Sequence, residues 1–260
     1  MKPEPTRAMS AQRFLGVPVE AHAHLESTND EVFRRAREGA PEGLVVVAEH
    51  QTQGRGRLGR SWFDAAGRSL LFSVLLKPAV PLQSYPLLAL VLASSVADAG
   101  AEAAGETLAV KWPNDVVHRG RKLCGVLAES RSLAPGKPPV LVLGAGVNVN
   151  QLEEDFPPEI RGRATSLRIA AGGRAFAIPE FLAAVLARFE RDVALARRDD
   201  PRPLFERVRP RLPAPGAQVR VALGERTVEG EVTEVTETGA LRVRDRASGV
   251  VETLAAGVLE

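Results

Sequence analysis

Residues 44–62 read LVVVAEHQTQGRGRLGRSW, an apolar run followed by a loop with three glycines and three arginines. The run from Leu44 to Ala48, with three consecutive valines, is typical of a buried β-strand. Glycines in the loop let backbone N–H groups approach a ligand closely, and arginine guanidiniums suit carboxylate and phosphate oxygens. Because the loop leaves the end of a rigid element, the stretch predicts an anion-binding flap over a pocket.

Two other interpretations of this loop must be weighed. It has no Gly-x4-Gly-Lys-Ser/Thr spacing, so it is not a P-loop. Gly54-x-Gly56-x-x-Gly59 has the letters of a dinucleotide-binding motif, but that motif must open a helix, and here the chain leads on toward another strand. A flexible Arg-Gly segment that binds nucleic acid without specificity also fits the loop, which alone does not separate the two functions.

Composition places the chain among ordinary globular proteins. It has 260 residues, 45% apolar and 25% charged, with a formal charge of +2. The single cysteine, Cys124, excludes an intramolecular disulfide and fits a reducing compartment. The most apolar window, 87–97, is expected to be too short to cross a bilayer, and no signal peptide is recognised. These features predict a cytoplasmic protein without a membrane partner. The four histidines lack metal-ligand spacing.

The first half of the chain alternates helix and strand signals. Residues 1–12 are expected to be a disordered lead-in. Thr28, with Glu31 three residues later, predicts a capping box that opens a helix, which Gly39 and Pro41 end. Residues 69–77 form an apolar strand, and 84–104 carry a helical apolar stripe that Gly105 closes.

The next segments carry polar residues at strand ends. Residues 111–117 read KWPNDVV, in which the proline forces a bend inside a strand and leaves Asn114 and Asp115 projecting. A tight turn at 118–121 leads to a partner strand at 122–129, where Gly125 marks a place of close approach. A central strand at 140–143 runs into GAGVNVN at 144–150.

The remaining residues predict a second, smaller unit. Residues 151–178 are irregular, with a possible helix entry at 165–167, and helices follow at 180–198 and 201–211. Short alternating strands at 219–223, 228–235, 240–244 and 250–254 suit an SH3-like barrel. The predicted fold is therefore α+β, with helices on one face of a mixed central sheet at 13–212 and a small β-barrel domain at 213–260.

Five motifs together resemble the biotin-protein ligases, also called biotin–[acetyl-CoA-carboxylase] ligases. In order they are STN at 27–29, GRGRLGR at 54–60, KWPND at 111–115, KLCGVLAE at 122–129 and GAGVN at 144–148. Each motif alone is weak, but the five in this order and spacing, over residues 25–150, are specific. The resemblance implies a sheet of the class II aminoacyl-tRNA synthetase and biotin ligase type, and the C-terminal barrel is similar to that family's tail.

The resemblance implies a two-step reaction. Biotin and ATP give biotinyl-5′-AMP and pyrophosphate, and a lysine of a biotin carboxyl carrier domain then attacks the mixed anhydride. Residue chemistry agrees, because joining a carboxylate to an α-phosphate sets anion against anion, so the site must supply positive charge and alignment. A closed flap would also keep water from the labile anhydride.

The resemblance also implies roles for individual residues. Biotin is expected to contact Ser27, Thr28, Asn29 and Gln51, with Gly54, Arg55 and Gly125 in the pocket wall. Arg57 and Lys122 are the catalytic candidates, holding the biotin carboxylate and the α-phosphate. Nucleotide binding involves Arg57, Arg60, Trp62, Asn114 and Asn148, and Asp115 is the candidate for Mg²⁺. Leu58 departs from relatives that have a second arginine there.

Simpler roles are open for several of these residues. Trp112 is expected to pack, Cys124 to be a small side chain under the sheet, and Lys111 and Asp115 can pair to brace the bend. Among functions, a lipoate-protein ligase shares the adenylate chemistry, and a non-enzymatic RNA-binding protein is the alternative from another class. About 25 residues before Ser27 leave no room for a winged helix-turn-helix, so DNA is not expected as a partner. A homodimer through a sheet edge is possible.

Overall fold

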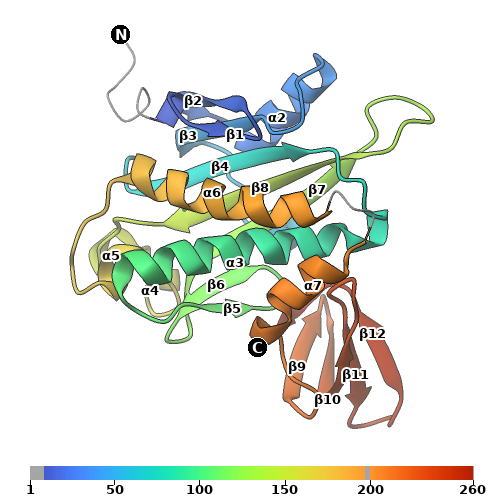
Figure 1. Ribbon diagram of the computed structural model, residues 1–260. Coiled ribbons are helices and arrows are strands. Elements are labelled where there is room, and N and C mark those ends of the chain that lie inside the picture. The colour runs from blue at the N-terminus through green and yellow to red at the C-terminus, as the bar shows by residue number, and fades with distance from the viewer. Residues whose placement is uncertain (1–8, 197–199, 260) are drawn as a thin grey trace.

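The computed structural model describes residues 9–196 and 200–259 (Figure 1). Its main feature is an eight-stranded mixed sheet in the order β1-β2-β3-β4-β8-β7-β6-β5. The strands are β1 (Arg13–Phe14), β2 (Val17–Leu25), β3 (Val45–Gln51), β4 (Ser69–Leu76), β5 (Ala109–Lys111), β6 (Asp115–His118), β7 (Arg121–Arg131) and β8 (Val140–Asn148). Only β2 and β3 pair in parallel, and the other pairs of this sheet are antiparallel.

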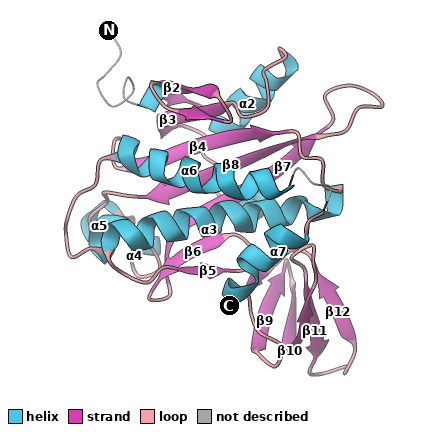
Figure 2. Ribbon diagram, viewed as in Figure 1, coloured by secondary structure: helices cyan, strands magenta, loops and turns pink. Residues whose placement is uncertain are grey.

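Both long helices cover one face of this sheet (Figure 2). They are α3 (Tyr85–Ala104) and α6 (Ile178–Ala196), which pack on the face that carries Val45 and Val47. The shorter α2 (Thr28–Arg37) lies on the opposite face, where it covers Val46. The prediction of helices on one face thus holds for the long helices, and the face of α2 is left partly open for a site.

Helix α3 is the most apolar element. Together with the turn before it, α3 forms the segment Leu82–Ala104, which by length and composition could cross a membrane. However, 72% of its most apolar stretch is buried within the protein. The apolar stretch is therefore longer than the expected 87–97, and it serves as the core helix of the fold. Gly105 ends α3 in the left-handed conformation, as predicted.

Short elements connect the large ones. They are the 3-10 turns η1 (Arg57–Gly59), η2 (Leu82–Ser84), η3 (Glu153–Asp155) and η4 (Arg209–Arg211) and the helices α4 (Pro158–Arg161), α5 (Leu167–Ala170) and α7 (Arg202–Val208). Residues 1–8 of the predicted lead-in lie outside the described residues. Residues 9–12 are packed rather than disordered, because Met9 is buried and the Gln12 amide donates to the carbonyl of Pro179.

Two local predictions are wrong in detail. The predicted N-cap, Thr28, is the first residue of helix α2; Ser27 is the N-cap, and its side chain forms no capping bond. The Thr28 hydroxyl donates to Gln51 Oε1 instead. The strand expected at 140–143 continues to Asn148, because the glycines that follow Leu143 still pair along β4 and β7. Strand β2 had no predicted counterpart.

The C-terminal residues form a separate antiparallel sheet in the order β12-β11-β10-β9-β13. Its strands are β9 (Gln218–Leu223), β10 (Arg226–Val235), β11 (Leu241–Asp245), β12 (Val251–Leu254) and β13 (Val258–Leu259). A small C-terminal β-domain is thus present. Within the described residues, its edge strands β12 and β13 do not pair with each other, so hydrogen bonds do not close a barrel.

This small sheet docks on the large domain through Trp112. The indole is buried, and its Nε1 donates to the carbonyl of Gly239 at 2.9 Å. Gly239 also lies against Leu87 and Leu90 of α3. The packing role predicted for Trp112 is confirmed, and it fixes the C-terminal sheet beside the open face of the main sheet.

Candidate active site

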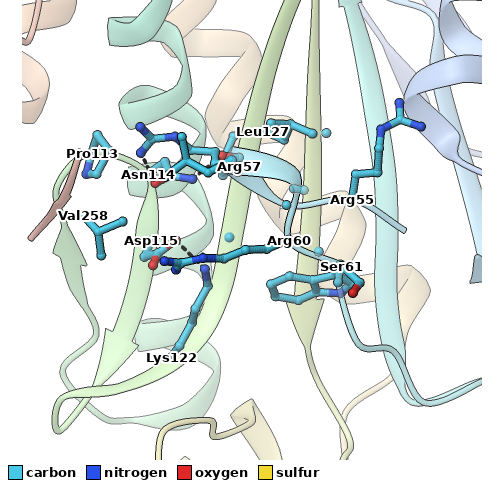
Figure 3. Close-up of a pocket in the computed structure, with 18 of the residues that line it drawn as sticks. Arg55, Arg57, Arg60, Ser61, Pro113, Asn114, Asp115, Lys122, Leu127 and Val258 are labelled. Carbon is cyan, nitrogen blue, oxygen red and sulfur yellow. Dashed lines mark hydrogen bonds and ion pairs between the residues drawn. The ribbon is translucent and has the colours of Figure 1, made fainter. Parts of the chain in front are cut away.

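A cavity of about 1000 Å³, counted out to open solvent, lies over the sheet where most predicted site residues meet (Figure 3). Its lining comes from the N-terminus of α2, the flap, the bend at 111–115, strands β7 and β8, and residues 257–259 of the C-terminal sheet. These segments are far apart in sequence. The site therefore exists only once both sheets have packed.

The flap is a compact loop closed by its own backbone. The Gly56 N–H donates to the Arg60 carbonyl at 2.7 Å, and the Trp62 N–H donates to the Gly54 carbonyl at 2.8 Å. Leu58 has a φ of 57° and stands 64% exposed at the tip. The loop contains one 3-10 turn and then returns to β4, so the apparent dinucleotide motif does not open a helix.

Glycines form the floor on which Trp62 lies. Gly125 and Gly146 pair across β7 and β8. A Cβ at Gly146 would fall 2.3 Å from Cε2 of Trp62, and one at Gly125 would fall 3.1 Å from its Cζ3. The indole can occupy this place only because side chains are missing below it. The close approach predicted at Gly125 is confirmed.

Lys122 faces the cavity because of an irregularity in its strand. The pairing of β6 with β7 shifts between Val116 and Val117, so that Val117 lies opposite Lys122 while Val116 lies opposite Cys124. Such a bulge changes the face to which a side chain points. Lys122 Nζ consequently lies 2.7 Å from Asp115 Oδ1 and 5.6 Å from the Trp62 ring centroid. Cys124 is fully buried under the sheet, as predicted, and burial raises the pKa of its thiol.

The described residues that hold Arg57 offer it neutral acceptors. Its Nη1 donates to Asn114 Oδ1 at 3.0 Å and to the carbonyl of Gly257 at 3.2 Å. The Asn114 amide in turn donates to the carbonyl of Val126. Burial lowers the pKa of Arg57, and the nearby Asp115 only partly offsets this effect. Asn114 therefore positions Arg57, and the charge of the guanidinium is only partly offset, by the nearby Asp115.

Asp115 is the single carboxylate among the described residues of the lining. It pairs with Lys122, and the alternative ion pair with Lys111 is not formed. The guanidinium of Arg60 points toward Asp115 and Lys122 (Figure 3). Lys111 also lines the cavity. Positive charge is thus in excess at this end, as a site for an anionic substrate requires.

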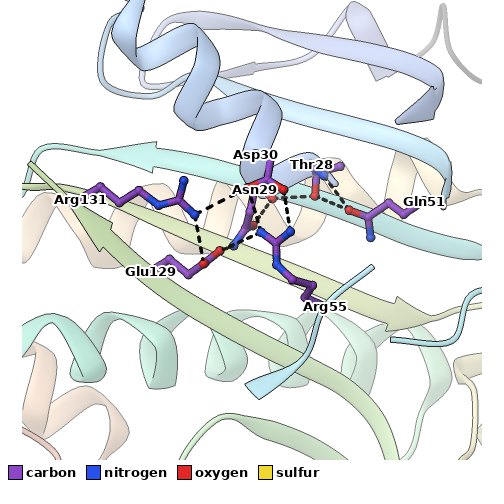
Figure 4. A network of polar contacts seen from close by, with 8 residues as sticks. Thr28, Asn29, Asp30, Gln51, Arg55, Glu129 and Arg131 are labelled. Carbon is purple, nitrogen blue, oxygen red and sulfur yellow. Dashed lines mark hydrogen bonds and ion pairs between the residues drawn. The ribbon is translucent and has the colours of Figure 1, made fainter. Parts of the chain in front are cut away.

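The opposite end of the cavity is a chain of hydrogen bonds (Figure 4). Gln51 Oε1 accepts from the backbone N–H and the hydroxyl of Thr28, at 2.7 and 3.0 Å. The Ser73 hydroxyl lies 2.7 Å from that of Thr28 and 2.6 Å from Asn29 Oδ1. Asn29 Nδ2 donates to Glu129 at 2.7 Å. Ser27, Thr28 and Asn29 are buried, so this end offers preorganised neutral partners.

Comparison with known proteins identifies the family. Residues 22–148 match the biotin/lipoate A/B protein ligase family. Over 228 residues the chain is 36% identical to the biotin–[acetyl-CoA-carboxylase] ligase of Mycobacterium tuberculosis, which covers 84% of this chain and 80% of that relative. The chain belongs to the biotin protein ligase family.

The chain also matches about half of a second relative and nearly all of a solved structure. The bifunctional ligase/repressor BirA of Bacillus subtilis is 42% identical over 151 residues, which are 58% of this chain and 46% of that protein. The chain therefore spans about half the length of this relative. The biotin protein ligase from Aquifex aeolicus in complex with biotin and ATP has a TM-score of 0.75 and 29% identity, covering 93% of this chain and 97% of that chain.

Three predicted site residues are placed differently from the rest. Gly54 and Asn148 do not line the cavity. Asn148 is buried, donates to the Thr165 carbonyl and accepts from Gln151. Arg55 lines the cavity, but its guanidinium points away, toward Asp30 (Figures 3 and 4). The other predicted residues all line the cavity.

One cluster outside the cavity has the composition of a metal site, with one histidine and two carboxylates. Ligand atoms of Glu20, His22 and Glu31 lie within 4.8 Å of one another. Both carboxylates are already paired, with Arg35 and Arg34 at 2.6 Å each. The neighbouring guanidiniums oppose a cation at this place, and we assign no metal to it.

Sequence reasoning missed several residues that shape the site of this biotin protein ligase family member. Ser73 links the hydrogen-bond chain, and Gly144 allows Asn29 to approach, because a Cβ there would lie 2.1 Å from Asn29 Oδ1. Gly257 supplies a carbonyl to Arg57. The alternate glycines 144 and 146 inside a strand were an available signal, because they fall on the same face. Nothing local marks Ser73 or Gly257.

Proposed function

We propose that this protein ligates biotin to a lysine of a biotin carboxyl carrier domain, with ATP as co-substrate and biotinyl-5′-AMP as intermediate. The observation that carries the proposal is the meeting of Arg57 and Lys122 in one cavity whose opposite end is neutral and hydrogen-bonding. A vitamin with a polar uncharged ring and a carboxylate tail matches both ends. Similarity to proteins named biotin ligases supports the same assignment.

In the first step, a carboxylate oxygen of biotin attacks the α-phosphorus of ATP. A new P–O bond forms, and the bond to the pyrophosphate leaving group breaks. Arg57 and Lys122 would bring the two anions together and stabilise the charge on the α-phosphate oxygens. In the second step, the acceptor lysine attacks the acyl carbon, and AMP leaves with the electron pair of the anhydride bond.

The neutral end of the cavity is assigned to the biotin ring. Ser27, Thr28, Asn29 and Gln51 would hydrogen-bond the ureido group, with Gly125 and Arg55 beside it. Because Thr28 bonds Gln51, and Ser73 joins Thr28 to Asn29, the ring would meet donors and acceptors in fixed orientations. The cost of ordering them on binding is correspondingly small.

The nucleotide is assigned to the charged end, with Trp62 stacking on adenine and Arg60 and Asn114 assisting. Asn148, which does not line the cavity, would act only from behind it. Asp115 is the one carboxylate in the described lining, and proteins bind Mg²⁺ through one or two carboxylates together with substrate phosphates. It would hold Mg²⁺ only in exchange for its ion pair with Lys122. A bound Mg²⁺ would supply further neutralisation of phosphate charge. We also propose that the protein is cytoplasmic and forms a homodimer.

The test is pyrophosphate release by the purified protein with ATP and either biotin or lipoate. We expect release with biotin, formation of biotinyl-5′-AMP, and transfer to a carrier domain. Release with lipoate alone would favour a lipoate-protein ligase. Absence of release with either acid, together with RNA binding that falls steeply with salt, would favour the RNA-binding alternative and overturn the proposal.

A further inference from the structure

The side chain of Arg55 belongs to a closed ring of four alternating charges at the rim of the site (Figure 4). Arg55 binds Asp30 through two hydrogen bonds, of 2.6 and 2.9 Å. Asp30 lies 3.7 Å from Arg131, and Arg131 lies 3.5 Å from Glu129. Glu129 closes the ring at 3.6 Å from Arg55. Each charged group thus has two neighbours of the opposite charge.

Three members of this ring stand on rigid elements. Asp30 is in the first turn of α2, and Glu129 and Arg131 are on β7. The guanidinium of Arg131 lies 4.0 Å from the ring centroid of Phe33, which is fully buried between α2 and the sheet. Arg55 alone comes from the flap. The ring therefore has a fixed side and a side that can leave with the loop.

The ring continues into the buried chain of hydrogen bonds at the neutral end of the cavity. Glu129 accepts from Asn29, which leads through Ser73 and Thr28 to Gln51. Gln51 precedes the flap by three residues. Residues 51 and 55 are therefore tied to the same network, and movement of the flap is opposed at both points.

We infer that Arg55 is a positioning residue whose ion pair with Asp30 latches the flap over the acyl-adenylate. This role rests on the proposed function and adds to it a determinant of how long the intermediate is retained. A single partly exposed ion pair holds little, but the doubly hydrogen-bonded guanidinium and the closed ring favour one geometry. Hydrogen bonding to Arg55 also lowers the pKa of Asp30, so the carboxylate stays ionised at neutral pH.

The experiment compares Arg55→Gln, Asp30→Asn and the double variant with the native protein. One measurement is the ratio of biotinyl-5′-AMP released to solution to that transferred to a carrier domain. The other is trypsin cleavage after Arg57 and Arg60 in the ligand-free protein, which does not depend on activity. Matched controls are Arg34→Gln and Glu31→Gln, because these residues form an ion pair on the same helix as Asp30 but outside the ring.

We expect both measurements to rise about fivefold in each single variant, the scale of one ion pair within a network. The double variant should match the singles, since either change opens the same latch. In 1 M salt the native protein should shift toward the variants, because screening beyond about 3 Å weakens the three ring contacts of 3.5–3.7 Å that support the pair. The inference would be overturned if Arg55→Gln released adenylate and was cleaved by trypsin as the native protein is. It would also be overturned if the effects of the two single variants multiplied in the double variant. If the native protein forms no adenylate, the proposed function fails, and the cleavage measurement still decides the latch.

Discussion

The two ends of the cavity hold their polar groups in opposite ways. At the α2 end, Thr28 and Asn29 are buried and bonded to one another through Ser73, so their hydrogen-bonding capacity is already organised. At the other end, Arg57, Arg60, Lys111 and Lys122 line the described cavity with Asp115 as the only carboxylate. One end is self-satisfied, and the other carries a surplus of charge.

This difference follows from the two kinds of partner each end can take. A neutral polar ring is recognised by groups held in place, because each unmade hydrogen bond in a buried site is costly. An anion is attracted by charge that has not been neutralised within the protein. Mutations at the charged end should therefore affect chemistry most, and those at the neutral end should affect affinity for the ring.

The largest effect is expected from Lys122→Ala. Removal of the ammonium group should lower the rate of adenylate formation on the order of 10²- to 10³-fold, as does loss of a preorganised charge-stabilising donor. The side chain is 40% exposed, so the fold should persist. Lys137→Ala, on an exposed loop, is the control. Pyrophosphate release and circular dichroism are the measurements, and native turnover in Lys122→Ala would remove this residue from the mechanism.

Gly146→Ala should have the next largest effect. The added Cβ would overlap the Trp62 indole, so the ring must leave its floor. Misplacement of this kind can cost up to roughly 10²-fold in turnover, and the KM for ATP should rise. Gly162→Ala is a matched control, since a Cβ there meets no atom within 4 Å and its φ is not positive. An unchanged KM for ATP would show that Trp62 does not support the nucleotide.

Thr28→Val tests the neutral end. The isosteric change removes one hydroxyl from the chain and leaves Gln51 and Ser73 short of a partner, which costs about 1–3 kcal/mol. The Kd for biotin should rise roughly tenfold, since each 1.4 kcal/mol is a factor of ten, while the KM for ATP stays constant. Thr52→Val, at an exposed position, is the control. Titration calorimetry checks this, and a selective change in the KM for ATP would contradict the division of the cavity.

The smallest effect concerns Asp30. Its pKa lies below the ordinary 3.8, chiefly because Arg55 donates to it. A carboxyl with a lowered folded-state pKa stabilises the fold above its unfolded pKa, and this contribution is lost as the pH falls through the folded value. Arg55→Gln should raise the Asp30 pKa toward 3.8, measured by NMR titration. The pKa of Glu31 should not change, because it is lowered chiefly by Arg34. An unchanged Asp30 pKa would show that Arg55 is not the cause of its shift.

Local signals predicted most elements of the fold. Apolar runs predicted β3 and β4, and Gly105 marked the end of α3. Strand β2 was missed because its three histidine and glutamate side chains break the apolar pattern. The site could be predicted from motifs as a set of residues, and most of that set does line one cavity.

By itself, the sequence determined the family, the two β-sheet units and the excess of cations in the flap and near Lys122, because strand patterns and charge are properties of neighbouring residues. Tertiary structure decided where those side chains point. A shifted strand pairing turns Lys122 into the cavity, and docking of the C-terminal sheet brings the Gly257 carbonyl to Arg57. Arg55 leaves the cavity for Asp30, because a guanidinium takes its nearest carboxylate in space. Such distances between segments are set by packing, which no single stretch of sequence encodes.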